Sequence, residues 1–288
     1  MLKRDVLKEI ILKKQEKIIL AKGQLPLEVL KEKINSLSPV RPFIKGIVRQ
    51  SEISLIAEIK KASPSQGIIR EDFNPREIAL QYKEAGAAAI SILTEEDYFK
   101  GSLSYIQQVR DTVNLPILRK DFIIDIYQIY ESRFFGADAI LLIAELLSKD
   151  KLSEFLDLAS DLGLECLVEA HNEKELKKAL SLKKANLIPN AVTQEVRTSG
   201  SRSDSRKVAT FGIGINNRDL HTLEIDFKVT ERLFPLIPKE KTVVIESGIK
   251  KYQDVLFLKI LGAKAVLIGE AFMETGDIKE KVKEIMGW

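Results

Sequence analysis

A carboxylate and an amine stand together near the end of the apolar run in Leu55–Ser65 (LIAEIKKASPS). Glu58 and Lys60 are two residues apart, and side chains two apart in a β-strand point to the same face. The Ser-Pro-Ser that follows, residues 63–65, is typical of a turn. Opposite charges at the end of a buried strand are costly unless they hold each other or a ligand. This stretch alone fits a structural ion pair and a binding site equally well.

Polar residues or glycines also end most of the other apolar runs of the chain. These residues are Thr94, Lys120, Glu145, Glu169, Asn216 with Arg218, Glu246-Ser247-Gly248, and Gly269. Ammonium groups beside carboxylates can transfer protons and stabilise a developing negative charge. A ring of such groups, contributed by most strands, favours an active site over a structural charge network, because like charges would crowd without a ligand.

The elements that position these residues alternate between strand and helix patterns. The predicted strands are 55–60, 88–94, 115–120, 138–144, 165–169, 212–216, 242–246 and 265–269, and helix-period segments include 75–86, 149–162, 172–182 and 250–261. Eight such units in roughly 230 residues predict an α/β (β/α)8 TIM barrel, in which the C-terminal ends of all strands meet at one face. A doubly wound open sheet is the alternative, but the first strand is not followed by Gly-x-Gly-x-x-Gly.

Length and composition fit a single domain, residues 1–288. A chain of 288 residues, 45% hydrophobic and 30% charged, has the size of one such barrel. Residues 1–45 carry amphipathic helix patterns, and we expect this N-terminal helical extension to pack on the barrel rather than on a membrane, with no signal peptide. The net charge of +3 is too small to indicate nucleic-acid binding. A single cysteine, Cys166, fits a reducing compartment, and we expect a cytoplasmic protein.

The turns after the last two predicted strands carry small residues that suit an anion. These turns are Glu246–Ile249 and Leu267–Ala271. Backbone N–H groups can approach a phosphate closely at such turns, and barrels often bind phosphate at this position. Two glycine turns side by side, with Lys60 across the mouth, predict a phosphorylated substrate.

These residues stand in motifs that resemble the indole-3-glycerol phosphate synthase family. The motifs are IAEIKKASPS (56–65), SILTEEDYFKGS (91–102), LPILRKDFIID (115–125), GADAILLIAELL (136–147), LVEAH (167–171), GINNRDL (214–220), ESGI (246–249) and LIGEAFM (267–273). They cover nearly the whole chain in the family's order. The resemblance implies a carboxy-lyase of tryptophan biosynthesis that acts on 1-(2-carboxyphenylamino)-1-deoxyribulose 5-phosphate. Such an enzyme closes the pyrrole ring and releases carbon dioxide and water, without a metal or an organic cofactor.

The resemblance also implies the roles of individual residues. Lys120 corresponds to the general acid of ring closure, and Glu169 to the general base of the later dehydration. Glu58 and Lys60 correspond to a pair that positions the substrate and takes part in proton transfer; how the acid steps divide between Lys60 and Lys120 stays open. The implied substrate-binding residues are Ser63, Pro64, Phe99, Phe122, Asn216, Arg218, Leu220, Glu246 and Ser247, among which Pro64, Phe99, Phe122 and Leu220 form apolar walls around the anthranilate ring. Phosphate binding falls to Gly248, Gly269 and Glu270, the last through its backbone N–H, because its carboxylate would repel a phosphate.

The two histidines and one segment stand outside this pattern. His171 and His221, with a single cysteine, do not make a usual zinc set, and we interpret both as solvated or hydrogen-bonded surface residues. Residues 189–213 form an apparent insertion before the sixth strand, with a Ser- and Arg-rich centre typical of a flexible loop. We expect this segment at the N-terminal face of the barrel, away from catalysis. Residues 209–213 are the favoured first half of the sixth strand, with 186–188 as the alternative.

Two other functions stay open at this point. One is another phosphosugar barrel, such as the neighbouring isomerase of the same pathway, which has no need of two catalytic lysines together with Glu169. The other is a barrel that serves as a binding or scaffold protein, and the intact Lys60, Lys120 and Glu169 argue against it. We expect a phosphorylated small molecule as substrate, no nucleic-acid or membrane partner, and a monomer; association with other tryptophan-pathway enzymes is left open.

Overall fold

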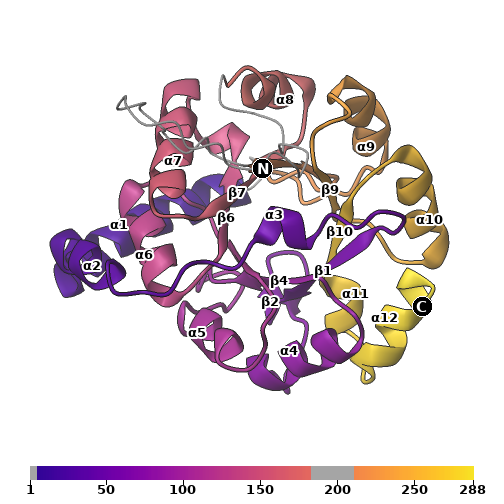
Figure 1. Cartoon of the computed structure of the whole chain (residues 1–288), viewed down its shortest axis with the longest axis horizontal. Helices are drawn as coiled ribbons and strands as arrows, with labels where there is room; N and C mark the ends of the chain where they lie inside the picture. Colours follow the sequence, from indigo (N-terminus) through magenta and orange to yellow (C-terminus); the bar gives the residue numbers. More distant parts are fainter. Residues whose placement is uncertain (1–4, 183–210) are drawn as a thin grey trace, which may run out of the picture.

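The structure is a computed structural model that describes residues 5–182 and 211–288. Within these residues, eight parallel strands close into a barrel in the order β1-β10-β9-β8-β7-β6-β5-β4 (Figure 1). The strands are β1 (Ser54–Ile59), β4 (Ala89–Leu93), β5 (Ile117–Lys120), β6 (Ala139–Ile143), β7 (Glu165–Ala170), β8 (Phe211–Asn216), β9 (Val243–Glu246) and β10 (Ala265–Ile268). The first barrel strand pairs with the last, which closes the ring.

Helices surround this barrel, as Figure 1 shows. Those of the barrel layer are α4 (Pro75–Glu84), α5 (Ser104–Arg110), α6 (Ile126–Phe135), η1 (Ala144–Leu146), α7 (Lys149–Asp161), α8 (Glu173–Leu180), α9 (Lys228–Leu233), η2 (Phe234–Leu236), α10 (Tyr252–Leu261), α11 (Glu270–Met273) and α12 (Ile278–Met286). The N-terminal extension contributes α1 (Val6–Gln24), α2 (Leu27–Ile34) and α3 (Phe43–Gly46).

Side chains along each strand alternate between two hydrophobic cores, because successive residues of a strand face opposite ways. One core lies inside the barrel and includes Ile56 and Leu118. The other lies between the strands and the helices and includes Ile117. On β5 this alternation directs Lys120 inward, with Leu118, and Arg119 outward, with Ile117.

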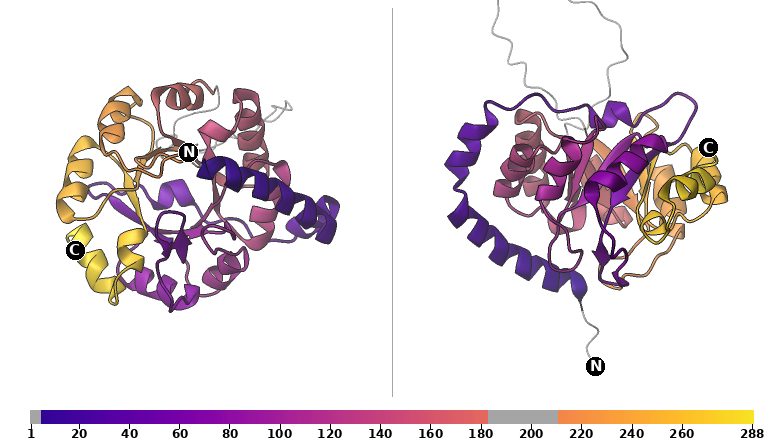
Figure 2. Two further views of the ribbon diagram at one scale, coloured as in Figure 1. Left: turned by 180° about the vertical axis from the view of Figure 1, so that it is seen from behind. Right: turned by 90° about the horizontal axis from the view of Figure 1, so that it is seen from below.

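The N-terminal extension covers both ends of the barrel (Figure 2). At the N-terminal ends of the strands, Phe43 and Ile44 of α3 are buried within the interior core, and the backbone N–H of Ile44 donates to Glu165 at the start of β7 (2.6 Å). At the opposite end, Leu7 and Ile10 of α1 join the same interior core beside Phe122. The expectation that the amphipathic extension packs on its own domain is therefore confirmed.

The predicted strands and helices are present, with shifts of a few residues at their ends. The loop after β1 holds a short antiparallel pair, β2 (Ala62–Ser63) and β3 (Gly67–Ile68), that the sequence did not predict. Of the proposed insertion 189–213, residues 189–210 lie outside the described residues. Phe211–Ile213 are part of β8, in line with the favoured of the two assignments for that strand, so the segment before β8 ends at or before residue 210.

Candidate active site

Four charged side chains form a buried cluster at the C-terminal ends of the strands, which we call the inner charge network: Glu58, Lys60, Lys120 and Glu246. Lys120 Nζ lies 2.6 Å from Glu246 Oε2 and 3.5 Å from Glu58 Oε2. Lys60 Nζ lies 3.3 Å from Glu58 Oε1. The prediction that Glu58 and Lys60 share one face is confirmed, and β1, β5 and β9 bring both lysines to one place.

Burial alone would neutralise Lys120 and Glu58, but their oppositely charged neighbours prevent this. Burial lowers the pKa of Lys120, yet the charges of Glu246 and Glu58 outweigh burial and raise that pKa above the ordinary value for lysine. Burial raises the pKa of Glu58, and the two neighbouring lysines outweigh it and lower that pKa below the ordinary value. Lys120 therefore remains an ammonium and Glu58 a carboxylate at neutral pH.

Two glycines leave the space in which these carboxylates lie. A Cβ at Gly214 of β8 would come within 2.5 Å of Glu246 Oε1, and a Cβ at Gly269 would come within 2.6 Å of Glu58 Oε1. Any larger residue at either position would displace a member of the inner charge network. The glycines of GINNRDL and LIGEAFM thus leave the space that two acids of the site occupy.

Glu169 lies at the end of β7, buried to 1% exposure, and contacts His171. His171 Nε2 is 3.1 Å from Glu169 Oε1, while Glu169 Oε2 accepts no hydrogen bond from the described residues. Burial raises the pKa of Glu169, but the hydrogen bond and charge of His171, together with the charge of Lys120, lower it to about 2. Burial and the nearby Glu169 charge raise the pKa of Glu246 to about 8. Their surroundings thus separate the pKa values of Glu169 and Glu246, and such a separation is typical of acid–base sites.

These groups line one cavity at the mouth of the barrel. Its polar wall includes Glu58, Lys60, Lys120, Glu169, Asn216, Arg218 and Ser247. Its apolar wall includes Phe99 and Phe122, whose ring centroids are 6.2 Å apart, together with Leu220. Ser63 and Pro64 line an adjoining apolar pocket that Leu7 and Ile10 of α1 complete. A flat aromatic group can pack against these rings, beside the charged wall.

A second pocket opens from the same charged wall toward the turns after β9 and β10. Ser247, Gly248, Gly269 and Glu270 line it together with Lys60 and Arg218. Ser247 adopts a φ of 64°, a left-handed backbone conformation that is uncommon for a residue other than glycine and that clusters at functional sites. The predicted phosphate-binding residues are thus gathered beside two cations.

The carboxylate of Glu270 makes its own contacts in this pocket. It accepts a hydrogen bond from Arg218 Nη2 (2.9 Å) and one from Gln66 Nε2 (2.9 Å), and lies 3.7 Å from Lys60 Nζ. The carboxylate therefore occupies cations that an anionic ligand would also use. The sequence suggested only a repulsive neighbour of the phosphate, because the contact with Arg218 joins residues far apart in the chain.

Comparison with known proteins places the chain in a family. The family model described as "Indole-3-glycerol phosphate synthase" matches residues 7–189 and 193–285. The chain belongs to the indole-3-glycerol phosphate synthase family. Proteins of that name from Acetivibrio thermocellus and Caldanaerobacter subterraneus are each 46% identical to it, over 97% of this chain and 98% of the former, and over 98% of this chain and 99% of the latter. One from Aliarcobacter butzleri is 44% identical, over 96% of this chain and 97% of its own length.

Solved structures of other enzymes share the fold. A chain from the tryptophan synthase a2b2 complex of Pyrococcus furiosus has a TM-score of 0.56 and 17% identity, covering 83% of this chain and 100% of its own. The 3-hexulose-6-phosphate synthase of Salmonella typhimurium has a TM-score of 0.58 and 10% identity, covering 82% of this chain and 97% of its own. At such identities the likeness shows a common barrel and nothing about the reaction.

The structure places some predicted strand-end residues away from the cavity of this synthase-family barrel. Thr94 was wrongly grouped with the mouth: its Oγ1 donates to Asp121 Oδ2 (2.6 Å) in the helix layer, because Leu93 faces inward and the next residue must face outward. Glu145 lies in η1 at the rim, where its carboxylate binds His221 Nε2 at 2.7 Å. Glu246 is fully buried beneath the cavity and holds Lys120 instead of lining the wall.

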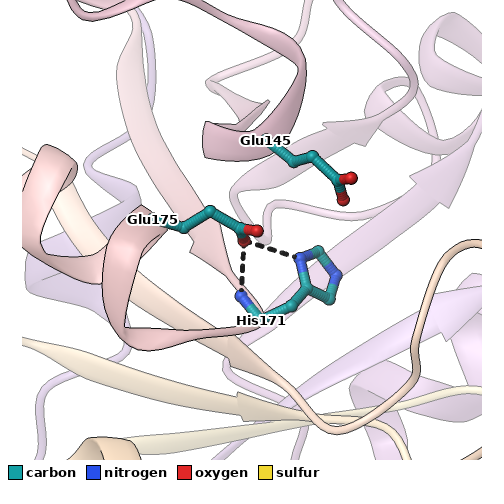
Figure 3. Close-up of side chains that lie close together, drawn as sticks. All are labelled: Glu145, His171 and Glu175. Carbon is teal, nitrogen blue, oxygen red and sulfur yellow. Dashed lines mark hydrogen bonds and ion pairs between the residues drawn. The ribbon is translucent and has the colours of Figure 1, made fainter.

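The interpretation of His171 as a surface residue was also wrong, since its side chain is only 10% exposed and lies between two carboxylates. The spacing of two residues between Glu169 and His171 could have revealed the contact. His171 also joins Glu145 and Glu175 in a group whose possible metal-ligand atoms all lie within 4.8 Å of one another (Figure 3). Each of these side chains already has a protein partner, since His171 contacts Glu169 and Glu175, and Glu145 contacts His221.

Proposed function

We propose that this protein converts 1-(2-carboxyphenylamino)-1-deoxyribulose 5-phosphate into indole-3-glycerol phosphate, carbon dioxide and water. The observation that carries the proposal is one cavity lined by Lys60, Lys120 and Glu169, bordered by an aromatic wall on one side and a cationic pocket on the other. Family membership supports the same reaction. A substrate with an aromatic ring at one end and a phosphate at the other matches these two borders.

Lys120 serves as the general acid of ring closure. The aromatic carbon attacks the ribulose carbonyl, and the carbonyl oxygen gains negative charge that an ammonium can neutralise. Lys120 keeps its proton because burial, which lowers its pKa, is outweighed by the charges of Glu246 and Glu58. Glu58 and Lys60 complete the site by positioning the substrate and taking part in proton transfer.

Glu169 serves as the general base of the dehydration that follows loss of carbon dioxide. Its low pKa, about 2, keeps it ionised at neutral pH, because the hydrogen bond and charge of His171 outweigh its burial. Asn216 and Arg218 line the same wall and are suited to bind the substrate's hydroxyl groups. Glu246 acts from beneath the cavity, through Lys120.

The two ends of the substrate occupy the two borders of the cavity. Phe99, Phe122, Leu220 and Pro64 enclose the anthranilate ring, with Ser63 at the edge of that pocket. Ser247, Gly248, Gly269 and the backbone N–H of Glu270 bind the phosphate, which displaces the Glu270 carboxylate from Arg218. This exchange offsets the repulsion expected between Glu270 and the phosphate.

The assay for this function follows the fluorescence of the indole product after the substrate is added to the purified protein. We expect one indole-3-glycerol phosphate and one carbon dioxide for each substrate consumed. A sugar-phosphate isomerase would change the substrate without releasing carbon dioxide, and a scaffold barrel would do neither. Either of these outcomes would contradict the proposal.

We propose a single-domain monomer working in the cytoplasm, and association with other enzymes of tryptophan biosynthesis is left open. None of the helices within residues 5–182 and 211–288 combines the length and the apolar composition needed to span a membrane. We also propose that residues 189–210 are dispensable for catalysis, because they join α8 to the start of β8 at the end of the barrel opposite the cavity.

A further inference from the structure

The imidazole ring of His171 lies between two buried carboxylates from consecutive elements. Its Nε2 is 3.1 Å from Glu169 Oε1 at the end of β7, and its Nδ1 is 3.1 Å from Glu175 Oε2 in the first turn of α8. Figure 3 shows Glu175 reaching both the ring and the backbone N–H of His171. Glu169 is 1% exposed and Glu175 6%, so water screens these contacts little.

The turn that carries His171 is fixed by the start of α8. Asn172 caps the helix, and its side chain accepts a hydrogen bond from the Glu175 backbone N–H (3.1 Å). The Glu175 carboxylate in turn accepts a hydrogen bond from the His171 backbone N–H (2.8 Å). Such reciprocal capping holds the Glu175 carboxylate in one place. Glu175 therefore holds His171 through both its backbone N–H and its imidazole ring.

The two carboxylate oxygens of Glu169 have different surroundings. Oε1 faces His171, whereas Oε2 is buried without a hydrogen bond from the described residues, and Glu169 lines the cavity. A buried carboxylate oxygen without a donor is costly unless a ligand supplies one. Oε2 is thus the oxygen left to receive a proton from a substrate.

The charge on the ring supports the same arrangement. Burial lowers the pKa of His171, but hydrogen bonds to Glu169 and Glu175 outweigh it and raise the pKa to about 10. The ring is therefore an imidazolium at neutral pH and favours the ionised form of Glu169. Other titratable groups face this region: Glu145 of η1, which binds His221; Lys120, which acts on Glu169 from β5; and Glu246 of β9, whose pKa burial and its interaction with Glu169 raise to about 8.

We propose that His171, held by Glu175, is a positioning residue that directs Glu169 Oε2 toward the substrate. The proposal rests on the proposed role of Glu169 as the general base. His171 does not line the cavity and acts only through the carboxylate that it holds. Glu175 in turn positions His171 and acts on the substrate only through His171 and Glu169.

The first test is the steady-state kinetics of His171→Asn as a function of pH. We expect kcat to fall roughly 10- to 100-fold with little change in KM, because a misplaced base slows the chemical step. Without the imidazolium, Glu169 holds its proton more tightly, so the acidic limb of the kcat profile moves to higher pH. Glu175→Gln should shift the limb in the same direction by less. His221→Asn is the matched control, since His221 binds Asp5 and Glu145 but not Glu169, and should leave the limb in place.

The second test is a double-mutant cycle with Glu169→Gln. If His171 acts through Glu169, adding His171→Asn to Glu169→Gln should cause no further loss of kcat. An equal loss in both backgrounds, or a His171→Asn variant that melts at a lower temperature with an unmoved acidic limb, would overturn the proposal and leave His171 a structural residue. Wild-type turnover by Glu169→Gln alone would instead overturn the role of Glu169, and this proposal with it.

Discussion

Two neighbouring residues of β5 anchor two buried charge networks on opposite sides of the barrel wall. Arg119 faces outward and belongs to what we call the outer charge network: Lys14, Arg119, Asp121 and Glu131. Asp121, which follows the end of β5, also borders the cavity. Arg119 lies 2.9 Å from Asp121 and 2.9 Å from Glu131, and Lys14 of α1 lies 2.8 Å from Asp121. Lys120 faces inward and belongs to the inner charge network.

The two networks differ in how completely their hydrogen bonds are made. Within the described chain, no side-chain nitrogen or oxygen of the outer network is buried without a partner, and Thr94, Gln128 and Ser132 supply further bonds to Arg119. The inner network leaves Glu246 Oε1 unbonded, as its neighbour Glu169 leaves Oε2. Because unmade bonds are costly in a protein interior, they are expected where a ligand completes them. The completeness of hydrogen bonding therefore distinguishes these two networks more clearly than their burial does.

The largest expected effect comes from removing the inner cation. Lys120→Ala should lower kcat by about 10³-fold or more, because ring closure loses its acid, while the outer network and the fold persist. Steady-state turnover and circular dichroism of the purified variant test this together. Turnover near that of the wild type would remove Lys120 from the mechanism.

The matched change one residue earlier should have the reverse outcome. Arg119→Leu leaves Asp121 and Glu131 buried without their shared cation and should lower the free energy of unfolding by roughly 3–5 kcal/mol. The kcat of the folded fraction should stay within a few-fold of the wild type. Urea denaturation and active-site titration measure the two effects. A stable Arg119→Leu protein that has lost catalysis would erase the distinction between the networks.

The networks should also respond oppositely to pH. Burial raises the pKa of Asp121, but Lys14 and Arg119 outweigh it and lower that pKa below its ordinary value, so the stability it contributes is present above about pH 4 and is lost as the pH falls. Glu246 has its pKa raised to about 8 by burial and by Glu169, so its contribution is present at low pH and is lost as the pH rises toward 8.

Unfolding free energies of Asp121→Asn and Glu246→Gln across this range separate the two effects. Relative to the wild type, the deficit of Asp121→Asn should shrink on acidification below pH 4. The Glu246→Gln variant should gain on the wild type between about pH 4 and pH 8, because the wild-type group progressively loses its stabilising proton. Equal pH slopes for the two variants would contradict the contrast.

The smallest effect is expected at Glu270, in the pocket proposed to bind the phosphate. Glu270→Ala removes a carboxylate that holds Arg218 and approaches Lys60, so the substrate phosphate no longer competes with it. KM should fall a few-fold, corresponding to at most about 1 kcal/mol, with kcat nearly unchanged. A rise in KM would mean that Glu270 organises the pocket instead of competing for it.

Sequence periodicity predicted the barrel and most of the site because both depend on local rules. Alternation along β1 placed Glu58 and Lys60 together, and the order of strand ends placed Lys120 and Glu169 at one mouth. The prediction for Thr94 was wrong because Leu93 faces the cavity and the next residue along the chain therefore faces outward. Strand-end position alone does not say which way a side chain points.

Other features depend on contacts between distant residues and left no pattern to follow. The burial of Lys14 against Asp121 and the capture of Glu270 by Arg218 each require the folded chain. The position of His171 was missed for another reason, since a histidine outside a zinc set was interpreted as a surface residue. The 3.1 Å contact of His171 with Glu169 is local and follows the two-residue spacing of a strand.

The most direct test of the account measures carbon dioxide and indole in the same single turnover. The inner site, as proposed, divides the reaction between Lys120 for ring closure and Glu169 for dehydration. The Glu169→Gln variant should then release about one equivalent of carbon dioxide and form little indole, and Lys120→Ala should release neither. Indole formation by Glu169→Gln at the wild-type rate, or carbon dioxide release by Lys120→Ala, would contradict it.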